Sequence, residues 1–185
     1  MNLKSGTQQA VMMGLLVMSC IASKAYADEV SDADQTISLF KKTDPDLARF
    51  FKTSVGYAVF PSVAKGGLGL GGAHGSGVLY EGGEPVGGAS LTQITVGAQV
   101  GGQEYAEIIF FQTEKVLSNF KTGNLAFSGQ VSAVALASGA SANADYKGGV
   151  AVFTATKGGL MVEASIGGQK FSYTPFEKKK VGKRR

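Results

Sequence analysis

The chain contains few of the residues on which disulfide scaffolds and metal centres depend. Its 185 residues include one cysteine, one histidine and no tryptophan. A single cysteine cannot form a disulfide within the chain, and one cysteine with one histidine cannot supply the four protein ligands of a structural zinc site. Charged residues are also scarce, at 17% of the total. We therefore expect neither a metal nor any other cofactor.

Glycine, by contrast, is abundant. There are 27 glycines and only four prolines, and glycine reaches roughly twice its average share. No three-residue repeat accompanies them, which excludes a collagen-like chain. A hydrophobic share of 44% is typical of a folded domain rather than a disordered chain, and the length suggests one such domain.

The beginning of the chain has the features of an export signal. Lys4 precedes an uncharged apolar stretch, residues 10–22, which is too short to cross a bilayer as a helix. Ala25 and Ala27 then give the A-x-A pattern of signal-peptidase cleavage. We predict that residues 1–27 are removed, leaving an exported protein in the periplasm or at the cell envelope.

A second way of processing remains open. Residues 17–20, Val-Met-Ser-Cys, loosely resemble a lipoprotein signal, in which Cys20 would carry the lipid. Met18 fits poorly where a small residue is usual, so cleavage after Ala27 is favoured. Lipidation at Cys20 would anchor the domain to a membrane, whereas cleavage after Ala27 would release it.

Charge is divided unevenly along the chain. The last nine residues form a basic tail, 177–185, with a net charge of +5. The whole chain carries +4 and the predicted signal +2, so residues 28–176 carry −3. Such a tail is either a solvated end or a contact for anionic lipid. Its basic residues are Lys178, Lys179, Lys180, Lys183, Arg184 and Arg185.

Two short helices are predicted at the start of the expected domain. Ser31 is a candidate N-cap for the first, and Asp44 followed by Pro45 marks the start of the second. Leu47, Phe50 and Phe51 then fall on one helical face. These aromatic residues either pack on a sheet, which the pattern favours, or belong to a basic amphipathic surface that meets lipid.

After residue 55 the hydrophobic period changes from that of a helix to that of a strand. Strands are expected at 57–60, where Pro61 ends the first, and at 66–80, 89–101, 106–112, 150–156, 160–166 and 170–174. A helix with Thr113 as N-cap is expected to reach Phe120, and residues 125–142 form one strand or two. The predicted fold is α+β: a strongly curved, glycine-rich antiparallel sheet or barrel-like core with short N-terminal helices and one inserted helix.

Lys-Gly-Gly followed by an apolar residue is found three times, beginning at Lys65, Lys147 and Lys157. Two glycines after a lysine suit a tight turn that enters a strand. The repeat is most simply the reuse of one turn. A second hypothesis is that the three lysines form one basic rim.

Several short motifs resemble parts of catalytic or nucleotide-binding sites, but the residues around them do not fit such sites. Gly67, Gly69 and Gly72 have the spacing of a dinucleotide-binding loop, but the residues after them are poor helix formers, and a helix is required there. His74 and Ser76 lie in the same stretch without a G-x-S-x-G elbow. Glu104 and Glu107 would lie on opposite faces of a strand. We therefore expect a protein that is not an enzyme.

Short motifs follow one another in order along the chain: GYAVFPSV (residues 56–63), KGGLGLGG (65–72), GSGVL (75–79), VGAQVGGQE (96–104), IIFF (108–111) and GGQKF (167–171). This series resembles the SYLF lipid-binding domain family over residues 34–176. The predicted organisation is a signal peptide at 1–27, a SYLF-like domain at 28–176 and a basic tail at 177–185.

The resemblance implies a binding module. Eukaryotic members of the family bind phosphoinositide membranes through an N-terminal amphipathic helix, and some fungal members bind actin filaments. The corresponding segment here is residues 37–52. Because the chain carries an export signal, actin and cytosolic phosphoinositides are doubtful partners and nucleic acid is disfavoured, which leaves anionic lipid as the expected partner. The expected lipid-binding residues are Phe40, Lys41, Lys42, Arg49, Phe50, Phe51, Lys52, Lys65, Lys147 and Lys157.

Two alternatives stay open. The protein is either a peripheral lipid-binding module of a bacterial envelope or an envelope protein that binds another protein and has no direct role with lipid. A barrel embedded in an outer membrane is opposed by the helix expected near Val116 and by the basic end of the chain.

Overall fold

The computed structural model describes residues 25–125, 127, 132–156 and 168–177, with the backbone alone described at 68–70 and 95–101. A first helix covers residues 25–43. It is followed by the 3₁₀ helix η1 (Pro45–Leu47) and helix α2 (Ala48–Thr53). The remaining elements, in order, are β1 (Gly56–Glu81), β2 (Glu84–Phe111), α3 (Glu114–Lys121), β3 (Ala133–Ala135), β4 (Val150–Thr156) and β5 (Gln169–Pro175). The α+β prediction is confirmed.

Strands β1 and β2 form one long antiparallel hairpin. Their register runs from Gly56 opposite Phe111 to Glu81 opposite Glu84. The hairpin closes through Gly82 and Gly83, whose φ values of 59° and 87° lie in the left-handed region that glycine adopts at no steric cost. A two-residue turn of this kind matches the twist of the strands it joins.

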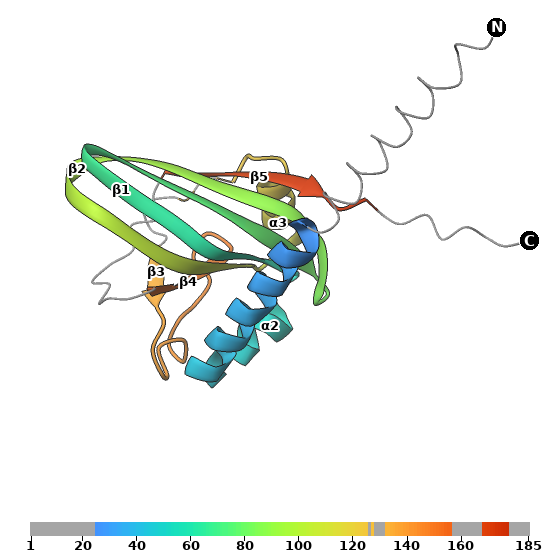
Figure 1. Cartoon of the computed structure of the whole chain (residues 1–185). Helices are drawn as coiled ribbons and strands as arrows, with labels where there is room; N and C mark the ends of the chain where they lie inside the picture. The colour runs from blue at the N-terminus through green and yellow to red at the C-terminus, as the bar shows by residue number, and fades with distance from the viewer. Residues whose placement is uncertain (1–24, 126, 128–131, 157–167, 178–185) are drawn as a thin grey trace, which may run out of the picture.

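The hairpin bends back so that its two halves face each other (Figure 1). Glycines in β1 permit the closest approach. A Cβ added at Gly77 would lie 2.2 Å from the carbonyl oxygen of Val59, and one added at Gly75 would lie 2.8 Å from that of Ser62. Both contacts join the second half of β1 to its own first half. The predicted strong curvature is present, but the sheet formed by the described strands is open rather than a closed barrel.

The opposite edge of β2 holds the rest of the sheet. Residues Tyr105–Phe111 of β2 pair with β4, and residues Gly87–Gln93 pair with β5, both antiparallel. Strand β3 lies parallel to β4 on its outer side. Strand β2 is therefore the element to which β1, β4 and β5 are all hydrogen-bonded.

Two hydrophobic clusters stabilise this arrangement. The inner core lies between the halves of the hairpin, where Phe60 of β1 and Phe111 of β2 meet Leu91, Phe171 of β5 and Phe120 of α3. The outer core lies on the other face, where the first helix, η1 and α2 cover β1, β2 and β4. Its largest buried side chains are Phe40, Leu47, Phe50, Tyr80, Phe110 and Phe153.

Several strand boundaries differ from the prediction. Strand β1 does not end at Pro61, because a register shift between Phe60 and Val63 accommodates the proline within the strand. Lys65-Gly66-Gly67 lies inside β1 and is not a turn. The strands expected at 89–101 and 106–112 are one strand, β2. Of residues 125–142, only Ala133–Ala135 among those described form a strand.

Other local predictions hold. The strand at Val150–Thr156 has the predicted bounds. Thr113 caps α3 by accepting a hydrogen bond from the amide of Val116, and Asp44 caps η1 ahead of Pro45. Gly148 and Gly149 form a turn with positive φ after Lys147. Ser31, however, is not an N-cap, because it lies within the first helix. The strand predicted at 160–166 lies outside the described residues.

Candidate binding surface

The helical segment at residues 37–52 is packed onto the sheet by its aromatic residues. Phe40 has no exposed surface and Phe50 has 2%. The ring of Phe50 contacts those of Phe110, Tyr146 and Phe153 with centroid separations of 5.0–5.5 Å. Of the two predicted arrangements, the structure thus has the one in which the aromatic residues pack on the sheet. Phe40 and Phe50 do not lie at a surface from which they could enter a bilayer. Their burial therefore corrects the prediction that Phe40 and Phe50 insert into lipid.

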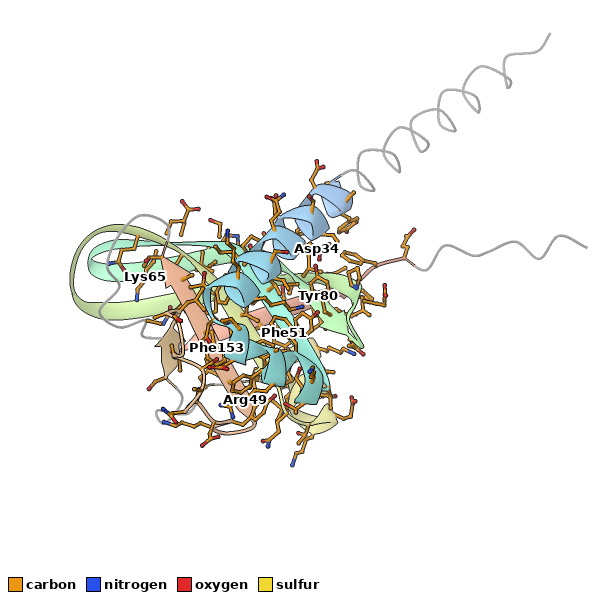
Figure 2. The ribbon with its side chains drawn as sticks, turned by 90° about the horizontal axis from the view of Figure 1, so that it is seen from below. Asp34, Arg49, Phe51, Lys65, Tyr80 and Phe153 are labelled. Carbon is orange, nitrogen blue, oxygen red and sulfur yellow. The ribbon has the colours of Figure 1, made fainter. Side chains whose placement is uncertain are left out.

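A polar contact holds the first helix in place as well. The hydroxyl of Tyr80 in β1 donates to the carboxylate of Asp34 at 2.8 Å, and the ring of Tyr80 stacks on that of Tyr57 at 5.1 Å. Figure 2 shows Asp34 on this helix close to Tyr80. Burial, followed by the hydrogen bond to Asp34, raises the pKa of Tyr80, so this hydroxyl remains a donor. Ala33 and Ile37 on the same helix are buried in the outer core.

Asp44 joins the helices to the loop between β3 and β4. Its side chain accepts from the amide of Ser141 at 2.7 Å and from the amide of Asp46 at 3.2 Å, and the residue has no exposed surface. Burial alone would raise the pKa of Asp44, but these hydrogen bonds outweigh it and the pKa lies below its ordinary value. A buried carboxylate therefore fixes the loop at Ser141.

Arg49 fixes the same loop from α2. Its guanidinium group donates to the carbonyl of Ser141 at 2.7 Å and to the carbonyl of Ala144, and it lies over the ring of Phe50 at 4.5 Å. Arginine presents a planar set of donors that suits such shared contacts. These donors bind backbone carbonyls, so Arg49 positions the loop. The expected contact of Arg49 with a lipid headgroup would require these hydrogen bonds to break.

The lysines of this segment are differently placed. Lys41, Lys42 and Lys52 are exposed, and the Lys41 ammonium lies 4.2 Å from the centroid of the half-buried Phe51 ring. Leu39 is exposed over 52% of its surface on the same helix. We call Lys41, Lys42, Phe51 and Lys52 the helix-face cluster. It presents cations and one aromatic ring on helices that are fixed to the sheet.

The three Lys-Gly-Gly lysines do not gather in one rim. Lys65 lies opposite Gln103 of β2, whereas the turn after Lys147 leads to Val150, opposite Phe111. The eight residue steps from Gln103 to Phe111 correspond to about 26 Å along a strand. Figure 2 places Lys65 at the curved end of the hairpin, away from Arg49. The shared rim is therefore wrong for Lys65 and Lys147, and Lys157 lies outside the described residues.

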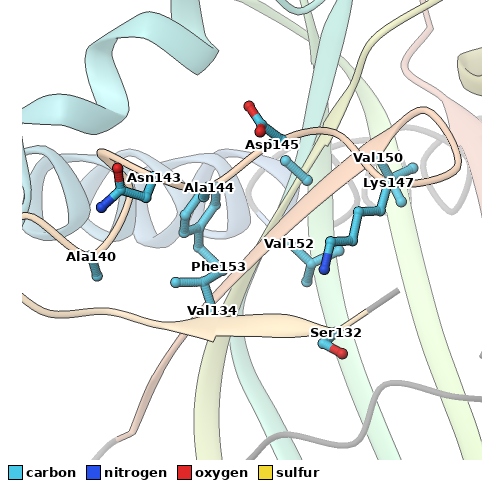
Figure 3. Close-up of a pocket in the computed structure, with 11 residues that line it drawn as sticks. Ser132, Val134, Ala140, Asn143, Ala144, Asp145, Lys147, Val150, Val152 and Phe153 are labelled. Carbon is cyan, nitrogen blue, oxygen red and sulfur yellow. The ribbon is translucent and has the colours of Figure 1, made fainter. Parts of the chain in front are cut away.

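A small cavity lies between β3, β4 and the loop that Asp44 and Arg49 fix (Figure 3). Its volume is about 280 Å³, and its lining is mostly alanine and valine, with Ser132, Asn143, Asp145 and Lys147 as polar residues. Ligand pockets are usually larger, at about 300–1,000 Å³. The cavity places the exposed Lys147 beside apolar surface and has no further feature of a ligand site.

The residues with possible catalytic roles do not come together in one site. Glu104 is exposed and accepts a hydrogen bond from the Ser62 hydroxyl at 2.6 Å, whereas Glu107 is buried. The two carboxylates are therefore not a catalytic pair, as the strand period predicted. His74 and Ser76 lie exposed in β1, and the glycines at 67–72 continue that strand instead of leading to a helix.

Two features are absent from the described part of the chain. Within residues 25–125, 127, 132–156 and 168–177, no three His, Cys, Asp or Glu side chains lie together as a metal-binding group. Across the same ranges, no helix has both the length and the apolar character needed to cross a membrane. Cys20 and the six basic residues of the tail lie outside this part of the chain.

Some structural residues gave no recognisable signal in the sequence. Ser141 is 97 residues from Asp44, and Gln169 is 62 residues from Glu107, yet each pair is hydrogen-bonded. Nothing local marks such partners. Asp44 was recognisable as a helix cap, but its second contact depends on the tertiary fold.

Comparison with known proteins gives a family for the second half of the chain. Residues 92–180, from β2 through β5, match the family model described as "Ysc84: Las17-binding protein actin regulator". This part of the chain is similar to the Ysc84 (SYLF) family. The SYLF resemblance is thereby confirmed. The Ysc84 match does not include the first helix, α2 or β1.

A curated bacterial protein is also similar. The chain is 28% identical over 142 residues to "Beta cell expansion factor A" of Aeromonas veronii. The aligned region covers 75% of this chain. The aligned region is 53% of that relative, so the chain spans about half of its length.

Proposed function

We propose that the protein is an exported, non-enzymatic binding module of the Ysc84 family that attaches to anionic lipid at a bacterial envelope membrane. The observation that carries the proposal is the helix-face cluster, in which the exposed Lys41 lies 4.2 Å from the half-buried Phe51 ring and Lys42 and Lys52 are also exposed. Basic residues near an anionic membrane surface each contribute about 1 kcal/mol to binding. The basic tail would add to this attraction.

The attachment we propose is peripheral and electrostatic. Insertion of Phe40 or Phe50 would require the helices to leave the outer core, where both rings are buried. It would also separate Asp34 from Tyr80 and Asp44 from Ser141. Contact through Lys41, Lys42 and Lys52 requires none of these changes, because their side chains are already exposed.

Co-sedimentation with vesicles tests this function. The exported protein is mixed with anionic and with zwitterionic vesicles at low and high salt. We expect binding to the anionic vesicles alone, weakened by salt because surface charges are screened. Replacing Lys41 and Lys42 by glutamine should lower the affinity about 30-fold.

A matched control removes the same amount of charge elsewhere. Lys115 on α3 and Lys170 on β5 are also exposed, so K115Q/K170Q has the same net charge as K41Q/K42Q. Equal loss of affinity in both double variants would show that net charge, and not the helix-face cluster, determines binding. Absence of binding to anionic vesicles at low salt would overturn the proposal.

The second candidate function is binding to another protein of the envelope, without a direct lipid contact. It is favoured by the description of the matching family as a Las17-binding actin regulator. Co-sedimentation of the protein with actin filaments tests the part of this alternative that the family's name suggests. An exported protein would meet a different partner, so we expect the filament test to be negative.

A further inference from the structure

Glu107 is a buried carboxyl group that takes no part in the helix-face cluster. It lies on β2, directly opposite Phe60 of β1 and Thr154 of β4. Residues directly opposite in an antiparallel pair point to the same face, and this face is the inner core. Glu107 has no exposed surface.

Gln169, the first residue of β5, is a hydrogen-bond partner of Glu107. The amide nitrogen Nε2 of Gln169 donates to Oε2 of Glu107 at 3.1 Å. Strand β5 itself pairs with the first half of β2, with Gln169 opposite Gln93. The bond between the two side chains therefore connects the second half of β2 with β5 and, through β5, with the first half of β2.

The two side chains leave one oxygen each without a donor. Oε1 of Glu107 and Oε1 of Gln169 are both buried, and neither has a hydrogen-bond partner among the described residues. An ionised carboxylate only accepts, and so does the amide oxygen, so the charged form of Glu107 cannot satisfy either atom. Buried acceptors without partners destabilise a fold.

Protonation of Glu107 would remove both of these unpaired acceptors. A protonated carboxyl group donates from one oxygen and accepts at the other. With the proton on Oε1, Glu107 would supply the donor that Oε1 of Gln169 lacks, while Oε2 would continue to accept from Nε2. The acid and the amide would then form a reciprocal pair with two hydrogen bonds.

The surroundings favour the uncharged form. The described neighbours on β1, β4 and β5 are Phe60, Thr154 and Gln169, and none carries a charge. On β2, Tyr105 is the titratable group that interacts with Glu107. Its pKa is raised by burial and then by that carboxylate, while a hydrogen bond with the Gln169 side chain acts in the opposite direction. Burial raises the pKa of Glu107 to about 7, although the Gln169 bond acts in the opposite direction.

We propose that Glu107 and Gln169 form a proton-controlled latch that holds β5 against the inner core. The latch is closed when Glu107 is protonated. Ionisation removes one of the two hydrogen bonds and leaves an unpaired charge between the halves of the hairpin. The attachment of β5 to β2 should therefore weaken as the pH rises through neutrality.

A titration of the wild-type protein is the first test. Carbon-13 NMR of the glutamate side-chain carboxyl groups, with E107Q to assign the signal, gives the midpoint for Glu107. We expect a midpoint within about one unit of 7, above the ordinary glutamate value of about 4.3. A midpoint below 5 would overturn the latch.

Hydrogen exchange of β5 is the second test, at pH 5.5 and 8.5 and corrected for intrinsic exchange. Wild-type protection at residues 169–174 should fall about tenfold or more between the two values. E107Q should keep its protection at both, because its amide donates to Gln169 at any pH. E104Q, on the same strand but exposed, should behave as wild type. An equal fall in E107Q would contradict the proposal, and if E107Q does not fold, the wild-type midpoint still decides.

Discussion

At the scale of single residues, the fold depends on polar side chains that each make two contacts. Asp44 begins η1 and also holds the loop at Ser141, and Arg49 anchors that loop while covering Phe50. The first role of Asp44 could be predicted because caps are local and have a preferred residue type. The second could not, since its partner is far away in the sequence. Arg49 and Phe50, which the sequence predicts to contact lipid, stabilise the tertiary structure instead.

The first prediction concerns Asp44. Replacement by asparagine should lower the free energy of unfolding by about 1–3 kcal/mol at pH 7, because a buried charged acceptor loses its charge. The folded-state pKa of Asp44 is depressed, so its contribution is present above the ordinary value of about 3.9 and is lost as the pH falls through the folded value. Urea unfolding at several pH values measures this.

Asp46 provides the matched control for that experiment. It is exposed and lies in the first turn of the same 3₁₀ helix. D46N should change stability by less than about 0.5 kcal/mol. If D44N and D46N are equally stable, the contact between Asp44 and Ser141 does not hold the loop.

At the scale of elements, the sequence predicted short structures better than long ones. The bounds of β4 and the start of α3 follow from local patterns, namely an apolar run and an N-cap. The sequence pattern divides each of the two longest strands, because Pro61 and the glycine pairs at 66–67 and 101–102 look like strand ends. In the structure these residues continue strands that bend. Curvature depends on what the strand packs against, which local patterns do not contain.

The second prediction concerns the bend in β1. Alanine at Gly77 would place its Cβ 2.2 Å from the carbonyl oxygen of Val59, so the backbone must move. Alanine at Gly72 would make an ordinary contact of 3.5 Å with the carbonyl oxygen of Gln93. We expect G77A to cost about 3 kcal/mol or more and G72A less than about 1 kcal/mol. Thermal or urea unfolding of the two variants measures the difference, and similar stabilities would contradict the close crossing.

The third prediction concerns the docking of the helices. Phe50→Ala should destabilise the protein by about 3–5 kcal/mol, since the ring is fully packed among Phe110, Tyr146 and Phe153. Phe50→Leu should cost clearly less, because it retains most of the apolar volume. Urea unfolding gives both values. A small effect of F50A would instead support a helix that leaves the sheet readily, as insertion into lipid requires.

At the scale of the whole molecule, charge is separated between a mildly acidic domain and a basic tail. Residues 28–176 carry −3 and residues 177–185 carry +5. An anionic membrane would therefore attract the tail and repel the average charge of the domain. The orientation of an attached protein should depend on which lysines face the membrane.

The fourth prediction follows from this separation. A protein that ends at Phe176 should bind anionic vesicles at least about tenfold more weakly than the full chain, with a smaller dependence on salt. Co-sedimentation at two salt concentrations measures both quantities. Unchanged affinity would assign the contact to the helix-face cluster alone, and complete loss would assign it to the tail.

The arrangement around β2 has a consequence for how the chain acquires its structure. Strand β5 contains the last strand residues described, yet it pairs with residues near the middle of the chain, Gly87–Gln93. Until residues 169–175 are available, that edge of β2 has unpaired amide and carbonyl groups, which are prone to pair with other chains. A chain that is synthesised from its N-terminus would expose this edge until its last described strand is available. Completion of the fold must then wait for the final strand, so this edge is where a chaperone would be most useful.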